Sequence, residues 1–217
     1  MANSNRLNEE GPELASAYFF NSPGPDNTSK VIEVVGQRVR LGDIPKILVA
    51  SESGQLALEL RKSFPLATVV CVTYNDETRR KYQKPALMKD QLLMQRIVLV
   101  DTVPEPLGRE LTFRNWWERR TIKLPGDSAD LFWMTLICVG GHGLRTAVEI
   151  VFMAVEAGAV PVGERVVSIA GTGWGADSAI VMKASRLDDA VGADPEKRMK
   201  IEQILAMPKR TEWTTYG

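Results

Sequence analysis

A glycine-rich loop follows a run of small and β-branched residues in the second half of the chain. The run from Val166 to Ala170 predicts a buried strand. The loop after it carries residues suited to contact an anion, namely Gly171, Thr172, Gly173, Gly175 and Asp177. Glycines let the backbone approach a ligand closely and expose several N–H groups at a strand end. The stretch therefore predicts a loop that binds a negatively charged group.

Two further segments of small residues lie next to predicted strands or helices. One contains Ser51, Ser53 and Gly54, after an apolar strand, and the other contains Gly141, His142 and Gly143, within an apolar helical stretch. The first N–H groups of a helix and its dipole favour anions. If the three loops converge, they form a site for a phosphate-bearing ligand, and we expect a nucleotide-like cofactor.

Each loop also has a purely structural interpretation. The glycine loop can be a tight hairpin without a ligand, and Ser51 or Ser53 can simply cap the following helix, as hydroxyl residues often do. The pattern Gly171-x-Gly173-x-x-Ala176 matches a loosened dinucleotide-binding fingerprint, but that motif needs a helix directly after it. Ser178 to Met182 predicts a strand there, which argues against a dinucleotide site.

His142, Cys71 and Cys138 are the only histidine and cysteines of the chain. His142 near a helix start should remain neutral and able to donate a hydrogen bond. One histidine and two distant cysteines are poor material for a zinc or iron site. Cys138 and His142 are four residues apart, but the glycines between them break the helix and no orienting carboxylate is evident, so a nucleophilic pair is disfavoured.

The overall composition favours one globular domain without a strong electrostatic field. The chain has 217 residues, 44% of them hydrophobic, and 27 basic residues balance 27 acidic ones. We expect a single α/β domain over 1–217, with 1–14 and 211–217 as mobile tails. The neutral charge argues against nucleic acid or a membrane surface as partner. A polar start without a signal-like apolar segment predicts a cytoplasmic protein.

The first half of the chain reads as alternating strands and helices. Apolar runs predict strands, and amphipathic stretches between them predict helices, the first of which Asn27 or Thr28 should cap. The expected strands are Ala15–Phe20, Lys46–Ala50, Ala67–Thr73 and Arg96–Asp101, and the expected helices are Val31–Leu41, Gln55–Phe64 and Asp76–Met94, the last interrupted at Pro85. Such a βαβ order predicts a three-layer α/β fold with a mostly parallel sheet.

The second half is less regular. Helical stretches are expected on both sides of the Gly140–Gly143 break, and the expected elements are helices Leu131–Val139 and Leu144–Ala157, strands Arg165–Ala170 and Ser178–Lys183, and a closing helix Lys197–Met207.

A helix over Arg109–Lys123 would gather aromatic residues on one face, namely Phe113, Trp116 and Trp117, together with Arg120. That face predicts core packing or a subunit contact, and hence a homo-oligomer, with a stacking platform for a flavin or base as the alternative.

Four blocks of the chain resemble the standalone proteins of the pyruvate kinase C-terminal domain-like family. They are Phe20–Thr28, Ile47–Ala57, Gly141–Gly158 and Glu164–Val181. The resemblance implies the fold of that domain and a Ser-Gly loop for phosphate at Ser51–Gly54. Because the standalone relatives are associated with flavin mononucleotide (FMN), it also implies FMN as the cofactor, with Asp177 free to accept from a ribityl hydroxyl or a ring N–H.

The chain departs from that family at two places. Members usually carry a His-His pair where this chain has Tyr74, Asn75 and Asp76, and their middle segment differs from Leu111–Ile122. Recognition of the ring is therefore the least transferable feature. The catalytic machinery of pyruvate kinase lies in other domains, so the resemblance implies no kinase activity and names no catalytic residue.

Three functions follow from these patterns. We expect first an FMN-binding protein with a redox role, second a non-catalytic sensor of a sugar phosphate or nucleotide, and third an interaction module whose glycines serve only tight turns. The residues expected to contact the ligand are Asn27, Thr28, Ser51, Ser53, Gly54, Thr73, Gly141, His142, Gly143, Gly171, Thr172, Gly173, Gly175 and Asp177. We expect no metal ligand among them.

Overall fold

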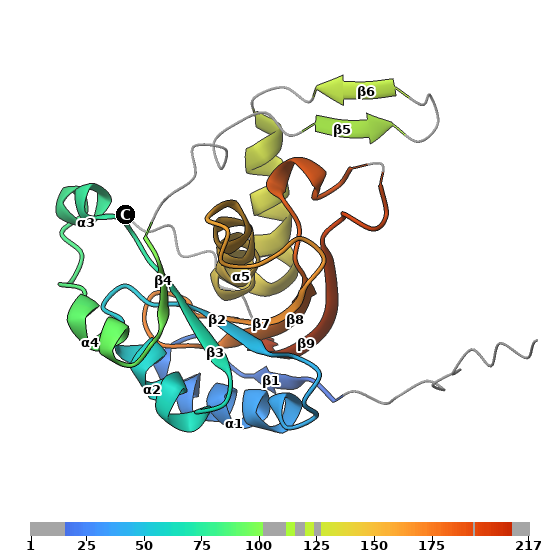
Figure 1. The fold of residues 1–217 in the computed structure, drawn as a ribbon. Helices are drawn as coiled ribbons and strands as arrows, with labels where there is room; N and C mark the ends of the chain where they lie inside the picture. The colour runs from blue at the N-terminus through green and yellow to red at the C-terminus, as the bar shows by residue number, and fades with distance from the viewer. Residues whose placement is uncertain (1–15, 102–111, 116–119, 124–126, 193, 210–217) are drawn as a thin grey trace, which may run out of the picture.

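The computed structural model of the protein describes residues 16–101, 112–115, 120–123, 127–192 and 194–209. The tails expected at 1–14 and 211–217 lie outside these residues. The chain folds as an α/β structure around a seven-stranded sheet of order β1-β9-β8-β7-β2-β3-β4 (Figure 1). Its strands are β1 Tyr18–Phe20, β2 Lys46–Ala50, β3 Thr68–Val72, β4 Val98–Val100, β7 Arg165–Ala170, β8 Ser178–Lys183 and β9 Lys200–Pro208.

The sheet is mostly parallel, as the sequence predicts. Four strand pairs are parallel, namely β1 with β9, β7 with β2, β2 with β3 and β3 with β4. Only β8 runs against its neighbours β7 and β9. The carboxyl ends of all the other strands therefore lie at one edge of the sheet, which we call the carboxyl edge, together with the start of β8.

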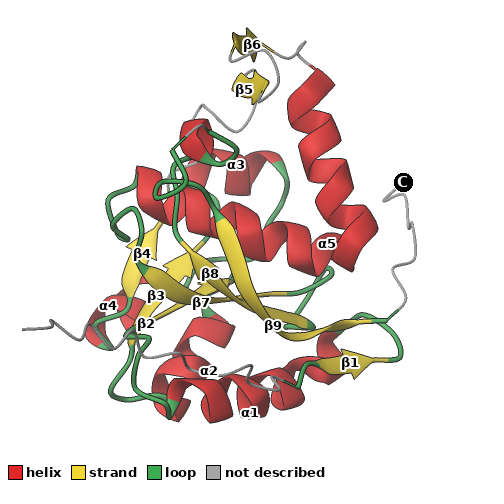
Figure 2. Ribbon diagram, turned by 90° about the vertical axis from the view of Figure 1, so that its right-hand side faces the viewer, coloured by secondary structure: helices red, strands yellow, loops and turns green. Residues whose placement is uncertain are grey.

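Helices cover both faces of the sheet and complete three layers. Figures 1 and 2 show α1, α2 and α4 on one face and the long α5 on the other. The helices are α1 Thr28–Val39, α2 Gln55–Ser63, α3 Asp76–Lys81, α4 Lys89–Met94 and α5 Asp127–Glu156, with short 3-10 turns at Pro25–Asn27 and Leu187–Asp189. The expected Asp76–Met94 helix is thus two short helices, because the segment around Pro85 separates them.

The strands are buried on both faces, which explains their continuous apolar sequences. In β2, Leu48 faces α5, while Ile47 and Val49 face α1 and α2, and all three side chains are fully buried. Cys71 of β3 is also completely buried, and burial raises the pKa of its thiol to about 12. Cys71 is therefore a packing residue and not a thiolate nucleophile.

The predicted closing helix Lys197–Met207 is wrong, because this segment forms β9. Its register against β8 skips Glu202 and Leu205, so the strand has lost the strict alternation that marks a strand in sequence. The end of β9 is buried between β8 and β1, and without it β8 would be an exposed edge. Tertiary pairing thus overrides the helical spacing of Ile201, Ile204 and Leu205.

The helix expected over Arg109–Lys123 is also wrong. The described parts of this segment form a separate antiparallel hairpin of β5 Thr112–Asn115 and β6 Arg120–Lys123, which lies beyond the first arm of α5 (Figure 1). Trp116 and Trp117 lie outside the described residues. The aromatic face proposed for a helix therefore does not exist in that form.

α5 is bent at the predicted glycine break. Gly140 and Gly141 have non-helical backbone angles, and Figure 2 shows the two arms of the helix meeting at an angle. The stretch Phe132–Glu156 is long and apolar enough to cross a membrane by length and composition, but 61% of its most apolar window is buried within the protein. This burial is typical of a core helix in a globular domain.

A network of charges joins the opposite edge of the sheet to the end of α1. Arg38, 8% exposed, holds both carboxylate oxygens of Asp43 at 2.5 and 2.8 Å. Arg165 at the start of β7 contacts Asp43 at 2.8 Å and Glu202 at 2.5 Å. The hydrogen bonds from Arg38 hold the pKa of Asp43 well below its usual range. The network fixes the turn between α1 and β2.

Replacing Asp43 should therefore destabilise the protein in a pH-dependent way. A carboxylate with a depressed folded-state pKa stabilises the fold above its unfolded pKa and loses that contribution as the pH falls. Because Asp43 is 40% exposed and partly screened, we expect Asp43→Asn to lower the free energy of unfolding by about 1 kcal/mol near neutral pH. Urea unfolding across the acid range should show this difference shrink, whereas Glu33→Gln, in an exposed pair with Lys30, should change little at any pH. A difference that widens on acidification would contradict the assignment.

Candidate functional site

The three predicted loops do converge at the carboxyl edge. β2 and β7 are neighbours, and Val49 lies opposite Ile169, which brings Ser51 and Gly171 to the same level just beyond the two strands. β2 continues to β3 through α2 on one face, whereas β7 is reached through α5 on the other face. The boundary between β2 and β7 is therefore the switch point of the topology, where α/β sheets generally bind their ligands.

Asp177 is the centre of this edge, and it is completely buried. One of its oxygens, Oδ2, accepts hydrogen bonds from the backbone N–H groups of Gly24 and Thr172, both at 3.0 Å. The other, Oδ1, accepts from the hydroxyl of Ser178 at 2.9 Å. Asp177 thus joins the β1–α1 connection to the β7–β8 loop. The prediction that Asp177 is free to accept from a ligand is wrong.

The bend of α5 packs directly on this carboxylate. A Cβ atom on Gly143 would overlap with Oδ1 of Asp177 and with the hydroxyl of Ser178, so only glycine fits. The second arm of α5 begins here, and its positive end stabilises the buried negative charge. Gly141 has a positive φ of 76° at the bend, and His142 next to it is half-buried. The Gly141–Gly143 segment therefore lies at the site, but the group that it contacts closely is Asp177 and not a ligand.

The start of α1 closes the far side of the glycine loop. Thr28 accepts from the N–H of Ala176 at 2.9 Å and donates to the carbonyl of Pro25 at 2.6 Å. Asn27 precedes the helix, as predicted, but its side chain donates to the carbonyl of Ser22 and does not cap the helix. The capping expected from Asn27 or Thr28 is therefore wrong in mechanism, because both side chains hold the loops together instead.

The glycine loop presents its backbone to the outside of the edge. Gly173 and Gly175 have positive φ angles of 83° and 69°, which turn the chain sharply around Trp174. Within the described part of the chain, no hydrogen bond uses the N–H groups of Gly173, Trp174 or Gly175. Gly173 and Trp174 are exposed, the latter by 65%. Three successive amides thus remain available at the end of β7. β8 follows this loop, as predicted, so the dinucleotide fingerprint lacks the helix it needs.

The hydroxyls of the Ser51–Gly54 loop bond to backbone N–H groups at the start of α2, but the N-cap residue is Gly54 and no side chain caps the helix, so the capping alternative is wrong in mechanism. Ser51 Oγ accepts from the N–H of Gly54 at 3.1 Å, and Ser53 Oγ accepts from the N–H of Gln55 at 3.3 Å. Gly54 has a positive φ of 87° and lies against Leu92. Both hydroxyls retain a hydrogen to donate, and the N–H groups of Glu52 and Ser53 have no partner among the described residues.

Arg79 organises the next loop, although it belongs to no motif that marks it in the sequence. The side chain is 7% exposed and lies under the ends of β2 and β3. Its guanidinium donates to the carbonyl of Glu52 at 2.5 Å, to the hydroxyl of Thr73 at 2.7 Å and to the carbonyl of Pro85. Thr73, predicted as a ligand contact, also donates to the Glu52 carbonyl at 3.3 Å. Thr73 therefore lies at the site, but its hydroxyl bonds to the backbone of the Ser51–Gly54 loop.

Tyr74 and four charged side chains around it form a polar cluster that sequence reasoning also missed. They come from separate segments that only the fold brings together, and they are Glu52, Tyr74, Lys84, Arg145 and Glu149. We call them the Tyr74 cluster. The departure of Tyr74 from the family pattern was the only signal that marked this position in the sequence.

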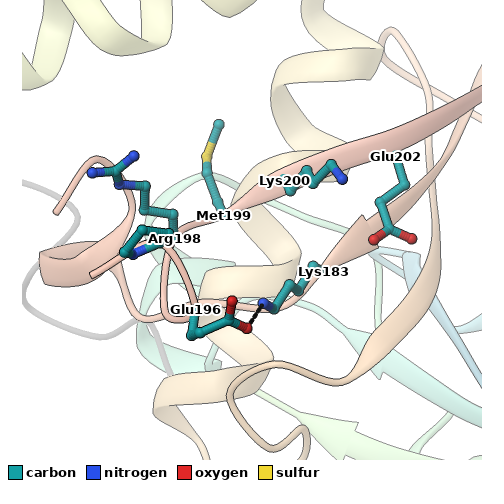
Figure 3. A pocket seen from close by; sticks show the side chains of 7 residues that line it. Lys183, Glu196, Arg198, Met199, Lys200 and Glu202 are labelled. Atoms are coloured by element: carbon teal, nitrogen blue, oxygen red, sulfur yellow. Dashed lines mark hydrogen bonds and ion pairs between the residues drawn. The ribbon is translucent and has the colours of Figure 1, made fainter. Parts of the chain in front are cut away.

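A shallow cavity of about 390 Å³ lies at the opposite edge of the sheet. Figure 3 shows its lining, in which Lys183 pairs with Glu196 at 3.1 Å and Lys200 lies opposite Lys183 across the strands. None of the predicted ligand contacts lies there. Mixed charges with large exposure, such as Glu196 at 88%, are typical of a solvated surface.

No family model matches the chain. The resemblance to the pyruvate kinase C-terminal domain-like family therefore stays a prediction, and the three-layer α/β architecture is what the fold supports. Among the described residues, no group of three or more histidine, cysteine, aspartate or glutamate side chains is placed to hold a metal ion.

Removing the carboxylate of Asp177 should loosen the whole edge. Asp177→Ala leaves two backbone N–H groups and a hydroxyl without their acceptor, and we expect the free energy of unfolding to fall by about 3 kcal/mol or more. Asp177→Asn keeps a neutral acceptor and should lose less. Asp26→Ala, at an exposed position of the same β1–α1 connection, should change stability by less than about 0.5 kcal/mol in the same chemical-denaturation series. Equal stabilities for the Asp177 and Asp26 variants would refute the central role of Asp177.

Proposed function

We propose that the protein binds a phosphorylated ligand, with FMN the expected one, at the carboxyl edge between β2 and β7. The single observation that carries this proposal is the row of three amides at Gly173, Trp174 and Gly175, which have no partner in the described chain. Successive backbone N–H groups in a turn can form a concave anion-binding site, so this row at a switch point fits an anionic ligand.

Helix ends support the same position. α1, α2 and the second arm of α5 all begin at this edge, so their positive ends and their first N–H groups gather there. Part of the positive electrostatic potential of these helix ends stabilises the buried carboxylate of Asp177. The rest of that potential is available at the outside of the loops, where a phosphate can bind without desolvating a large surface.

The Ser51–Gly54 loop supplies a second side to the phosphate site. The N–H groups of Glu52 and Ser53 lie one strand away from the glycine loop, since β2 and β7 are adjacent. Ser53 is half-buried, and its hydroxyl can still donate after accepting from Gln55. Glu52 does not repel the ligand strongly, because Lys84 neutralises its carboxylate at 2.8 Å.

When bound, FMN supplies hydride or electron transfer through its ring, and the protein contributes position and electrostatics. We therefore keep a redox role as part of the proposal and assign no catalytic residue. A sensor of a sugar phosphate would use the same amides, and its ligand would differ from FMN only in the group attached to the phosphate. Comparing FMN with riboflavin and with inorganic phosphate separates these functions, because an FMN protein gains affinity from both ends of the ligand.

The loop amides can be tested through the backbone of Gly173. Gly173→Ala places a side chain at a positive φ of 83° and should displace the amides, so we expect at least a tenfold loss of FMN affinity by fluorescence titration. Gly158→Ala is the matched control, since Gly158 has a φ of 73° with open space around it in the turn between α5 and β7. It should lose similar stability without losing FMN.

The wild-type protein should also bind FMN more tightly than riboflavin, which lacks the phosphate. Equal affinities for the two flavins would place the phosphate outside the protein. Failure to bind FMN together with binding of inorganic phosphate would favour the sensor, and binding of neither would refute the proposed function.

A further inference from the structure

The Tyr74 cluster lies beside the proposed phosphate site. Within the cluster, Lys84 links Glu52 to Tyr74, because its Nζ lies 2.8 Å from the Glu52 carboxylate and 5.5 Å from the centre of the Tyr74 ring. On the α5 side, Arg145 contacts Glu149 at 3.0 Å and stacks over Trp133 at 5.3 Å. All four charged side chains are partly buried, with exposures between 18% and 31%. Partly desolvated charges of this kind are costly and concentrate at functional sites.

Arg79 shows that this part of the edge is rigidly built. It holds the carbonyls of Glu52 and Tyr74 as well as the hydroxyl of Thr73, so the two loops that carry Glu52 and Tyr74 are fixed relative to each other. Burying a guanidinium to hold two surface loops contributes little to the core. Such support is expected where the side chains above it must keep a defined geometry.

The electrostatics of the cluster suit hydrogen bonding with an uncharged group. Burial raises the pKa of Tyr74, with opposing contributions from Lys84 and Arg145 and reinforcing ones from Glu52 and Glu149, so the phenol stays protonated and able to donate. Burial also raises the pKa of Glu149, while the charge of Arg145 lowers it. The acceptor role of Glu149 rests on its geometry, since Oε1 accepts from Arg145 at 3.0 Å and Oε2 has no hydrogen-bond partner in the described chain.

The distance between the cluster and the glycine loop selects a two-ended ligand. The loop follows β7 and Tyr74 follows β3, two strands away in the order β7-β2-β3. Two strand spacings are about 10 Å. A ligand with a phosphate at one end and a polar ring at the other can span this separation, whereas free phosphate cannot.

We propose that Tyr74 and Glu149 recognise the ring end of the ligand, with Tyr74 donating to a ring carbonyl and Glu149 accepting from an adjacent ring N–H. The matching chemistry is a cyclic amide or imide, as in the outer ring of a flavin. This inference rests on the proposed function and deepens it, because it assigns the end of the ligand that the phosphate loops do not touch.

The test uses the full-length protein with three probes, which are FMN, FMN methylated at the ring imide nitrogen, and inorganic phosphate. Tyr74→Phe and Glu149→Leu should each weaken FMN binding about tenfold, a loss of one hydrogen bond to the ring, and leave phosphate affinity unchanged. The methylated flavin should bind the wild type as weakly as FMN binds Glu149→Leu. Tyr82→Phe and Glu156→Leu are matched controls, since Tyr82 is 59% exposed and Glu156, at the end of α5, forms an ion pair with Arg186.

The outcomes separate this inference from the proposed function. Wild-type affinity for FMN in both variants overturns the inference and leaves the phosphate site intact. Loss of phosphate binding in the variants also overturns it, because the cluster would then act on the loops and not on the ring. A wild-type protein that binds neither FMN nor phosphate refutes the proposed function and this inference together.

Discussion

The buried carboxylate of Asp177 is the interaction on which the carboxyl edge depends. It has no solvent contact, yet two backbone amides and a hydroxyl satisfy it, and the second arm of α5 begins against it. Because a buried charge is costly unless fully paired, the β1–α1 connection, the glycine loop and the bend of α5 must meet at this position. The amides of Gly173, Trp174 and Gly175 are left without a partner in the described chain. The buried carboxylate of Asp177 thus positions the loops that we propose bind the phosphate of a ligand.

The sequence predicts most of the sheet because its strands are buried on both faces. Continuous apolar runs located β2, β3 and β7 closely, and the pair of glycines at Gly140 and Gly141 correctly predicted the bend of α5. The convergence of the loops also followed, since parallel strands end at a common edge. These predictions worked where a local pattern and the tertiary structure require the same conformation.

The sequence-based predictions are wrong where contacts between distant parts of the chain determine the local structure. β9 looked helical because two bulges erase its alternation, and only its place between β8 and β1 makes it a strand. Asp177 was assigned to a ligand because its partner Gly24 is 153 residues away in the chain. Arg79 and Glu149 carry no motif, and their roles depend on which loops the fold places beside them. Local sequence contains none of this information.

Backbone amide resonances, followed by NMR during titration with FMN, would show whether the glycine loop holds the phosphate. We expect the largest shifts at Gly173, Trp174 and Gly175, with smaller ones at Glu52 and Ser53, while the amides around Lys183 and Lys200 at the opposite edge stay unchanged. Shifts confined to the opposite edge, or no shifts at the glycine loop under saturating FMN, would contradict this binding site.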